Sequence, residues 1–276
     1  MPEQVRREAT LRRSSRRPRF VAIGHVTNDH LAAGVVPGGS ALYAGLAAAY
    51  LGCQAHIVTR HGPDFTGLAT LAAAGVTVEG GGGPRTTTFE NVYEDGVRRS
   101  RLLAVAEPLT EAAVADIVFC CPVAGEVAAS AVRGPLVGAG LQGWLRSRGD
   151  DGTVRRAPPG DLSFLGGCRA VFLSDADADD AAELSDRLAR LVPIVVLTHG
   201  AAGATLYADG EVTLLPAVPA HEVDPTGAGD VFAATFLIAL ARGQAPVTAG
   251  HFAARAAAIV VEDVGPAALP RLAMLR

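Results

Sequence analysis

Short apolar runs alternate with longer, helix-like segments along most of the chain. The short runs, which are typical of buried strands, lie at residues 20–24, 55–59, 76–78, 116–120, 135–141, 170–174 and 194–198. The segments with helical character lie at residues 40–51, 65–74, 180–191, 228–241 and 248–261. Repeated strand–helix units favour a mostly parallel sheet with helices on both faces, so we predict an α/β fold.

Two β-prone regions depart from this alternation. Residues 86–93 and 97–105 flank an Asp-Gly pair, which is a hairpin signal. We interpret the hairpin of residues 86–105 as part of a small β lid outside the main sheet. Residues 203–207 and 212–215 also flank an Asp-Gly turn and are predicted to pair antiparallel. Residues 148–159 are polar and rich in Arg, Asp, Gly and Pro, so we predict a loop.

Length and charge separate a large domain from an N-terminal tail. With 276 residues and 49% apolar composition, the chain can form one domain with a sizeable core, assigned to residues 20–276. Residues 1–19 carry seven Arg and two Glu and are predicted to be a disordered tail, with a phosphate-binding or targeting arm as the alternative. This tail has no apolar core typical of a secretory signal, and no long apolar run predicts a membrane helix. The net charge of −4 argues against nucleic acid as a partner, and we expect a cytoplasmic protein.

The absence of lysine excludes several kinds of phosphate and carbonyl chemistry. All 24 basic residues other than histidine are Arg, whereas a P-loop, a protein kinase and a Schiff-base enzyme each need a Lys in their ordinary forms. Phosphate binding would then use Arg, backbone N–H groups and helix dipoles. The cysteines have neither zinc nor paired-thiol spacing and are predicted to be buried free thiols; they are Cys53, Cys120, Cys121 and Cys168.

The segment of residues 224–230 carries the strongest chemical signal. It reads Asp-Pro-Thr-Gly-Ala-Gly-Asp and leads directly into the predicted helix of residues 228–241. Gly227 and Gly229 allow a tight turn that exposes N–H groups at a helix N-terminus, where anions bind. A carboxylate in the first turn, Asp230, would lie beside that anion site, an arrangement that suits phosphoryl transfer to a hydroxyl. A glycine-rich turn with Asp230 as a simple helix cap is the alternative.

This segment resembles the C-terminal signature of the ribokinase-like (PfkB) carbohydrate kinases. The resemblance implies a ribokinase-like α/β fold with a small β lid, and a kinase that needs no P-loop lysine. It implies that Asp230 deprotonates the acceptor hydroxyl, while the N–H groups of Gly227, Ala228 and Gly229 form the anion hole. ATP as donor and Mg²⁺ as cofactor follow from the same resemblance. Many members also bind a monovalent cation such as K⁺ near this turn, where Thr226 could supply an oxygen.

Other segments match the family in the same order along the chain. Gly38 and Gly39, which open a predicted helix, resemble the N-terminal di-glycine motif beside the substrate, with an ordinary helix start as the alternative. Asp29, predicted in a loop after the first strand, matches the acid that binds acceptor hydroxyls, and a solvated loop residue is its alternative. Asn91 in the predicted lid and Arg146 complete the expected substrate-binding residues.

A further stretch resembles the family's T-x-G-x-x-G segment, which lines the nucleotide phosphates. It runs from Thr198 to Gly203 and reads Thr-His-Gly-Ala-Ala-Gly; a strand-end turn explains it equally well when it is taken alone. The residues expected to bind the nucleotide are Thr198, Gly200, Gly203, Thr226 and His251. His251 lies on a predicted helix face that core packing explains as well as adenine binding.

Three departures from the family leave the substrate open. Tyr43 stands where members often carry Asn, and residues 142–146 retain only the Arg of D-x-N-x-R. Residues 174–177 read Ser-Asp-Ala-Asp in place of N-x-x-E, so Asp177 is the metal candidate, acting through metal-bound water. Residues 86–101 and 142–143 are similar to the myo-inositol kinase-like branch.

The function expected from the sequence is phosphoryl transfer to a small sugar or cyclic polyol, with myo-inositol as one candidate. A nucleoside kinase is the enzymatic alternative, since Tyr43 and Phe89 could hold a base. The other alternative is a non-catalytic ribokinase-like protein that binds a ligand, because a protein can keep a fold without keeping its catalytic function. Both a monomer and a homodimer fit the composition.

Overall fold

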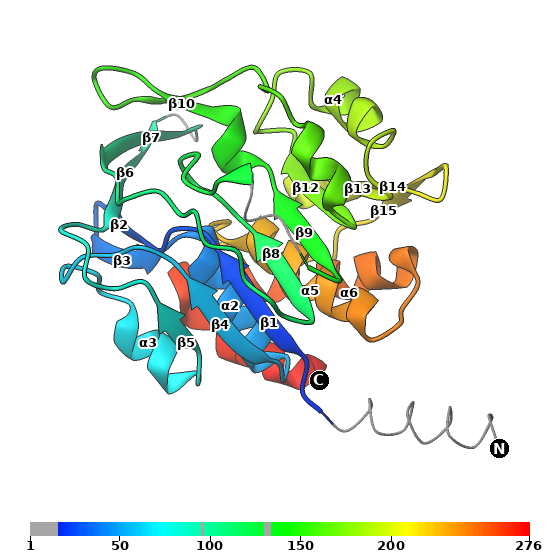
Figure 1. The fold of residues 1–276 in the computed structure, drawn as a ribbon, viewed down its shortest axis with the longest axis horizontal. Helices are drawn as coiled ribbons and strands as arrows, with labels where there is room; N and C mark the ends of the chain where they lie inside the picture. The colour runs from blue at the N-terminus through cyan, green and yellow to red at the C-terminus, as the bar shows by residue number, and fades with distance from the viewer. Residues whose placement is uncertain (1–15, 95–96, 130–133) are drawn as a thin grey trace.

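The computed structural model describes residues 16–94, 97–129 and 134–276. These residues form a nine-stranded central sheet, a four-stranded lid and a separate two-stranded hairpin (Figure 1). Residues 1–15, which make up most of the predicted tail, lie outside the described part. Within that part, no helix has the length and apolar character needed to cross a membrane.

The central sheet has the strand order β15-β14-β13-β12-β9-β8-β1-β4-β5. Its strands are β1 (Arg19–Ile23), β4 (Gln54–Val58), β5 (Thr77–Glu79), β8 (Ile117–Cys120), β9 (Val137–Gly140), β12 (Ala170–Ser174), β13 (Ile194–Thr198), β14 (Ala204–Ala208) and β15 (Glu211–Leu215). The strands from β13 to β5 pair in parallel, and only β14 and β15 add antiparallel. The predicted fold class, a mostly parallel sheet with a late antiparallel pair, is confirmed.

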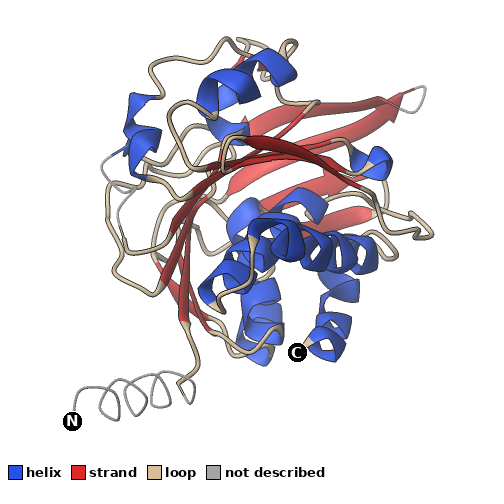
Figure 2. Cartoon of the chain, turned by 90° about the vertical axis from the view of Figure 1, so that its right-hand side faces the viewer, coloured by secondary structure: helices blue, strands red, loops and turns tan. Residues whose placement is uncertain are grey.

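Helices cover both faces of this sheet (Figure 2). On β1, Phe20 and Ala22 belong to one hydrophobic core and Val21 and Ile23 to a second, because successive side chains of a strand point to opposite faces. The first core is completed by α2 (Ser40–Tyr50), α3 (Leu68–Ala73), α5 (Ala228–Ala241) and α6 (Pro246–Val260), and the second by α4 (Ala181–Leu188). The central part of α5 is buried all round because it packs against the sheet, α2 and α6.

The lid has the strand order β3-β2-β6-β7 and is larger than the sequence predicts. Strands β6 (Thr87–Glu94) and β7 (Val97–Ala104) pair as the predicted hairpin, and β2 (Thr27–Leu31) and β3 (Gly34–Gly38) extend it. The prediction that Asp29 lies in a loop is therefore wrong, because it lies in β2. The sequences TNDHL and GVVPG have no apolar alternation, so it is the pairing with β6 that makes β2 a strand.

A short hairpin joins the lid to the central sheet. It consists of β10 (Arg146–Arg148) and β11 (Val154–Arg156), so the loop predicted over residues 148–159 is wrong where these strands form. At its tip the N–H of Leu102 in β7 donates to the carbonyl oxygen of Gly152 at 2.8 Å. The remaining elements are 3₁₀ turns, at η2 (Gln142–Leu145), η3 (Ser163–Gly167), η4 (Gly200–Ala202) and η5 (Gly265–Leu275).

Candidate active site

A cavity of about 150 Å³ lies at the carboxyl ends of the parallel strands, under the lid. Ligands of open α/β sheets bind in this position, where the helix that follows each strand begins. The cavity brings together many of the residues predicted from the sequence, namely Asp29, Gly39, Arg146, Asp177, Thr198, Thr226, Gly227, Gly229 and Asp230. It also contains residues that the sequence reasoning did not single out as polar site residues, namely Thr27, Ser40, Ser100, Gln142 and Ser174.

Gly227 is the N-cap of α5, and both its backbone conformation and its surroundings favour glycine. Its φ of 81° is left-handed, and a Cβ built on it would lie 2.2 Å from Cδ1 of Tyr43. Tyr43 therefore packs its ring directly against the turn that precedes the helix. The N–H of Ala228 donates weakly, at 3.3 Å, to the carbonyl oxygen of Pro225, so the N–H groups of Gly227 and Gly229 are the better candidates for the anion hole.

Asp230 lies in the first turn of α5, and its carboxylate faces the cavity. Gly227 is the N-cap and no side chain caps this helix, so Asp230 is not the simple helix cap of the alternative interpretation. Burial raises the pKa of Asp230 to about 6, against a hydrogen bond from Ser40 and the charge of Arg146, which lower it, while Asp177 raises it further. A carboxylate with a pKa near neutrality suits a general base at physiological pH.

Asp177 lines the same cavity as Asp230, from the turn after β12. It is 6% exposed, and its Oδ2 accepts the N–H of Ser174 at 2.9 Å. Burial raises the pKa of Asp177, and the charge of Arg146 and a hydrogen bond from Gln142 oppose this. Arg146 thus acts electrostatically on both carboxylates, from the first position of β10.

The oxygen atoms at this edge of the cavity fit a magnesium ion bound through water. In the described residues there is no cluster of three or more His, Cys, Asp or Glu that could enclose a metal. Mg²⁺ usually keeps several waters and binds through one or two carboxylates together with substrate phosphates. Asp177 and the adjacent Ser174 hydroxyl would supply such oxygens, and the metal role of Asp177 stays a prediction.

The lid supplies the opposite, polar wall of the cavity. Asp29 is 8% exposed, and its Oδ1 accepts the hydroxyl of Thr27 at 2.8 Å. The di-glycine leaves room for this acid, because a Cβ on Gly38 would lie 2.6 Å from Oδ2 of Asp29. A Cβ on Gly39, whose φ is 93°, would lie 2.4 Å from the carbonyl oxygen of His25, so this motif holds the lid strands close to the start of α2.

Asn91, predicted to contact substrate, is not among the residues that line the described cavity. It is 4% exposed, and its Oδ1 accepts the hydroxyl of Ser100 at 2.7 Å. Ser100, on the neighbouring strand β7, and Phe89 line the cavity instead. Asn91 can therefore orient Ser100, and only the pairing of β6 with β7 reveals this.

The residues predicted to bind the donor are divided between the cavity and its surroundings. Thr198 and Thr226 line it, whereas Gly200 and Gly203 form the adjoining turn with φ values of 55° and 100°. A Cβ on Gly203 would lie 2.2 Å from the carbonyl oxygen of Leu215, so this glycine closes the turn onto β15. His251 is exposed on α6, and it is not among the residues lining the described cavity.

Asp224 ties the signature segment to the last turn of the chain. Its Oδ1 accepts the N–H of Thr226 at 3.0 Å, and its Oδ2 accepts the N–H of Gly265 at 2.9 Å. Both carboxylate oxygens thus have backbone donors, and Asp224 fixes the turn that precedes α5. The cysteines are buried free thiols in the structure, as predicted.

Comparisons with known proteins agree with this geometry. Residues 169–272 match the model of the pfkB family carbohydrate kinases. Among solved structures, a pyrophosphate-dependent kinase in the ribokinase family, complexed with a pyrophosphate analogue and myo-inositol, superposes with a TM-score of 0.78 at 21% identity. The superposition covers 90% of this chain and 96% of the chain of that kinase. The chain has the ribokinase fold and resembles the pfkB carbohydrate kinases. The family resemblance predicted from the sequence is thereby confirmed.

Other relatives of this ribokinase-like chain differ in what they act on. The ribokinase of Arabidopsis thaliana, complexed with ribose and ATP, has a TM-score of 0.69 at 19% identity, covering 94% of this chain and 99% of that chain. A nucleoside kinase of Methanothermobacter thermautotrophicus is 44% identical over 72 residues, and an inositol 3-kinase of Zea mays is 32% identical over 124 residues. These alignments cover 26% and 45% of this chain, and only 23% and 33% of the relatives. They support the predicted PfkB-type kinase without selecting its acceptor.

Proposed function

We propose that this chain transfers a phosphoryl group from ATP to a hydroxyl of a small sugar or cyclic polyol. The observation that carries the proposal is Asp230. It is a carboxylate with a pKa of about 6, placed at the N-terminus of α5 in a cavity whose opposite wall is polar. A base beside an anion-binding helix end is the arrangement that phosphoryl transfer needs.

In this mechanism Asp29 binds acceptor hydroxyls and orients one of them toward Asp230. Asp230 takes the proton of that hydroxyl as its oxygen forms a bond to the terminal phosphorus of the donor, and the bond from that phosphorus to the leaving oxygen breaks. The N–H groups of Gly227 and Gly229 stabilise the charge on the transferring phosphoryl group. Arg146 supplies the positive charge that a lysine supplies in other phosphate-binding sites.

Magnesium would neutralise the donor phosphates, as it does in other phosphoryl-transfer enzymes. Asp177 and Ser174 would hold its waters at the donor side of the cavity. The lid would exclude bulk water from the acceptor, so that the donor is not lost to hydrolysis.

Pyrophosphate is the competing donor, and a specific observation favours it. The related pyrophosphate-dependent kinase has a TM-score of 0.78, against 0.69 for the ribokinase that binds ATP. In addition, His251, the residue expected near adenine, does not line the described cavity. Both donors offer the same terminal phosphoryl group, so the roles of Asp230 and Arg146 are the same for either.

The acceptor wall supports a polyol over a nucleoside. The aromatic rings at the cavity are Tyr43, Phe89, Phe119 and Phe172. Tyr43 packs on Gly227, and Phe119 and Phe172 pack edge to face with each other at 6.1 Å, so Phe89 alone lies on the lid side. A nucleobase stacked between two aromatic rings would need a second ring on the lid side, and Phe89 is the one ring that lines the described cavity there. The polar side chains of Thr27, Asp29 and Ser100 instead suit the hydroxyl groups of a polyol.

The decisive experiment measures phosphoryl transfer with Mg²⁺ and K⁺ from each of two donors, ATP and pyrophosphate. The acceptor panel is myo-inositol, ribose, fructose, adenosine and cytidine, and the product is identified by phosphorus NMR. A phosphorylated polyol or sugar is the expected result, and a phosphorylated nucleoside would replace the acceptor class. Binding of a donor without transfer to any acceptor, and with the same donor affinity in Asp230→Asn, would favour the non-catalytic ligand-binding alternative.

A further inference from the structure

Ser174 is held in one orientation at the donor side of the cavity. It ends β12 and lines the cavity next to Asp177, whose Oδ2 accepts its N–H at 2.9 Å. Its hydroxyl donates to Oδ1 of Asp175 at 3.2 Å and accepts the N–H of Ala176 at 3.1 Å. A serine hydroxyl has one hydrogen and two lone pairs. With the hydrogen committed to Asp175, what remains for a ligand is a lone pair.

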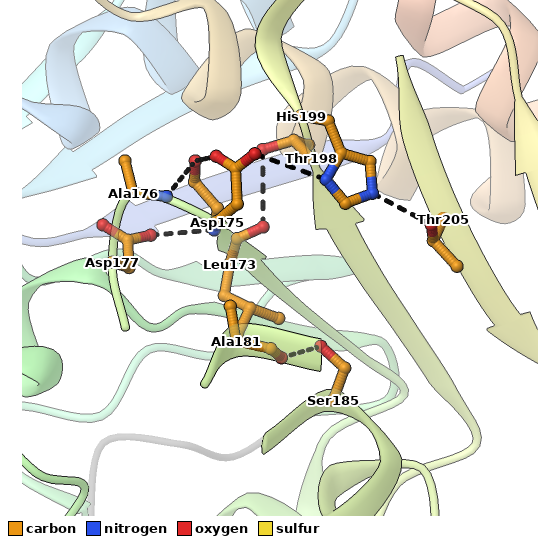
Figure 3. Close-up of polar contacts among 10 residues, drawn as sticks. Leu173, Asp175, Ala176, Asp177, Ala181, Ser185, Thr198, His199 and Thr205 are labelled. Carbon is orange, nitrogen blue, oxygen red and sulfur yellow. Dashed lines mark hydrogen bonds and ion pairs between the residues drawn. The ribbon is translucent and has the colours of Figure 1, made fainter. Parts of the chain in front are cut away.

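His199 in turn holds Asp175. The Nδ1 of His199 lies 3.4 Å from Oδ2 of Asp175, and its Nε2 lies 2.9 Å from the hydroxyl oxygen of Thr205. Figure 3 shows the imidazole between these two groups, at the end of β13. The N–H of Asp175 also donates to the carbonyl oxygen of Thr198 at 3.1 Å, which anchors the turn to the neighbouring strand. A continuous chain of contacts thus runs from Thr205 through His199 and Asp175 to Ser174.

The consequence is a pair of adjacent acceptors facing the donor. Asp177 offers a carboxylate oxygen, and Ser174 offers a hydroxyl lone pair beside it. Water bound to a metal ion presents hydrogens, so it pairs with acceptors; a phosphate oxygen needs a donor instead. The arrangement therefore favours a hydrated cation over a bare phosphate at this edge.

We propose that Asp175 and His199 are positioning residues that fix Ser174 as an acceptor beside Asp177, so that this edge binds the hydrated Mg²⁺ of the phosphoryl donor. The inference rests on the proposed kinase function and adds to it two residues outside the cavity. It also gives a physical reason why Ser-Asp-Ala-Asp can stand where the family has N-x-x-E. The hydroxyl and its two supporting residues replace a single amide side chain.

The test measures Mn²⁺ affinity directly, as a substitute for Mg²⁺. Electron paramagnetic resonance follows Mn²⁺ binding to the protein in the presence of a non-hydrolysable donor, either an imido analogue of ATP or methylene bisphosphonate. Asp175→Asn leaves one acceptor oxygen where Ser174 and His199 each use one, so the amide can no longer accept from both groups at once. We expect the Mn²⁺ dissociation constant to rise about three- to tenfold, the effect of one hydrogen bond, while the acceptor KM stays unchanged.

The matched control is Asp186→Asn in α4. It removes the same charge from an exposed side chain that does not belong to the chain of contacts from Thr205 to Ser174. The Mn²⁺ dissociation constant of this control should match wild type. Equal Mn²⁺ affinities for Asp175→Asn and Asp186→Asn would overturn the proposal.

A double-mutant cycle separates positioning from general damage to the fold. Ser174→Ala alone should weaken Mn²⁺ binding as Asp175→Asn does, and the double variant should be no weaker than either, because both act through one hydroxyl. Additive losses would contradict the proposed route, as would an equal rise in the acceptor KM. His199→Asn provides a second variant of the same chain of contacts, with the same expected direction. Absence of phosphoryl transfer by wild type would contradict the proposed function instead. The Mn²⁺ affinities are measured without turnover, so they distinguish that failure from a failure of the positioning proposal.

Discussion

Replacing Asp230 with Asn should abolish turnover and at the same time stabilise the fold. The substitution keeps the size of the side chain and removes its charge and its basicity. Loss of a general base typically costs 10²- to 10⁴-fold in rate, so we expect kcat to fall by about that factor. Donor binding should persist, because the backbone N–H groups of Gly227 and Gly229 are unchanged.

The predicted gain in stability follows from the raised pKa. The pKa of Asp230 goes from 3.8 to about 6 on folding, mainly by burial. A folded-state pKa above the unfolded one means that the ionised form is penalised in the folded protein. At pH 7.5 the group is ionised in both states, and the penalty is at most about 3 kcal/mol, at about 1.4 kcal/mol for each pKa unit. The penalty disappears as the pH falls through 6 toward 3.8.

The assay is urea unfolding of wild type and Asp230→Asn at pH 7.5 and pH 4, combined with product formation at pH 7.5. We expect the variant to be more stable by about 1–3 kcal/mol at pH 7.5, and by much less at pH 4, where wild type becomes protonated. A structural carboxylate would show the opposite sign, because its removal destabilises. A variant that is less stable at pH 7.5, or that keeps a tenth or more of the wild-type kcat, would refute the reasoning.

Three further outcomes are expected from the site. The acid limb of kcat should have an apparent pKa near 6, and Ser40→Ala should move it to higher pH, since the Ser40 hydrogen bond lowers the pKa of Asp230; pH–rate profiles of both proteins measure this. Gly227→Ala should lose activity and stability, because its Cβ would lie 2.2 Å from a ring atom, whereas Gly243→Ala, also left-handed with φ 84° but with no atom within 4 Å, should retain kcat. Asp29→Ala should raise the acceptor KM at least tenfold and leave the donor KM within twofold, as initial-rate kinetics would show.

The predicted fold came from local patterns that tertiary contacts did not override. The inner strands of the central sheet, from β13 to β1, are short apolar runs because they are buried on both faces, and they are visible in the sequence for that reason. The lid strands β2 and β3 could not be recognised in the sequence, because they are rich in polar residues, Gly and Pro. They become strands only through pairing, β2 with β6 and β3 with β2. The β10–β11 hairpin could not be recognised for the same reason, because its strands lie in a stretch rich in Arg, Asp and Gly.

The candidate site divides along similar lines. Asp230 and its glycines could be identified because a helix N-terminus with a base needs a contiguous segment, and such a segment has a readable order of residues. Ser40 follows the di-glycine directly, so its place beside the cavity had a local signal that the sequence reasoning missed. The contact of Ser100 with Asn91 and the contact of Asp175 with His199 had none, because each joins segments that belong to different strands.

The sequence by itself determined the order along the chain of the inner strands and the main helices, the glycines at which the backbone turns, and the segment that places a carboxylate at a helix start. These properties depend on neighbours along the chain, through periodicity, chain stiffness and unpaired N–H groups. The tertiary structure alone decided that Asp230 would share a cavity with Asp177 and Arg146, and that burial would raise its pKa to about 6. Such shifts depend on the distance between charges and their removal from water, and both are set when distant segments pack together.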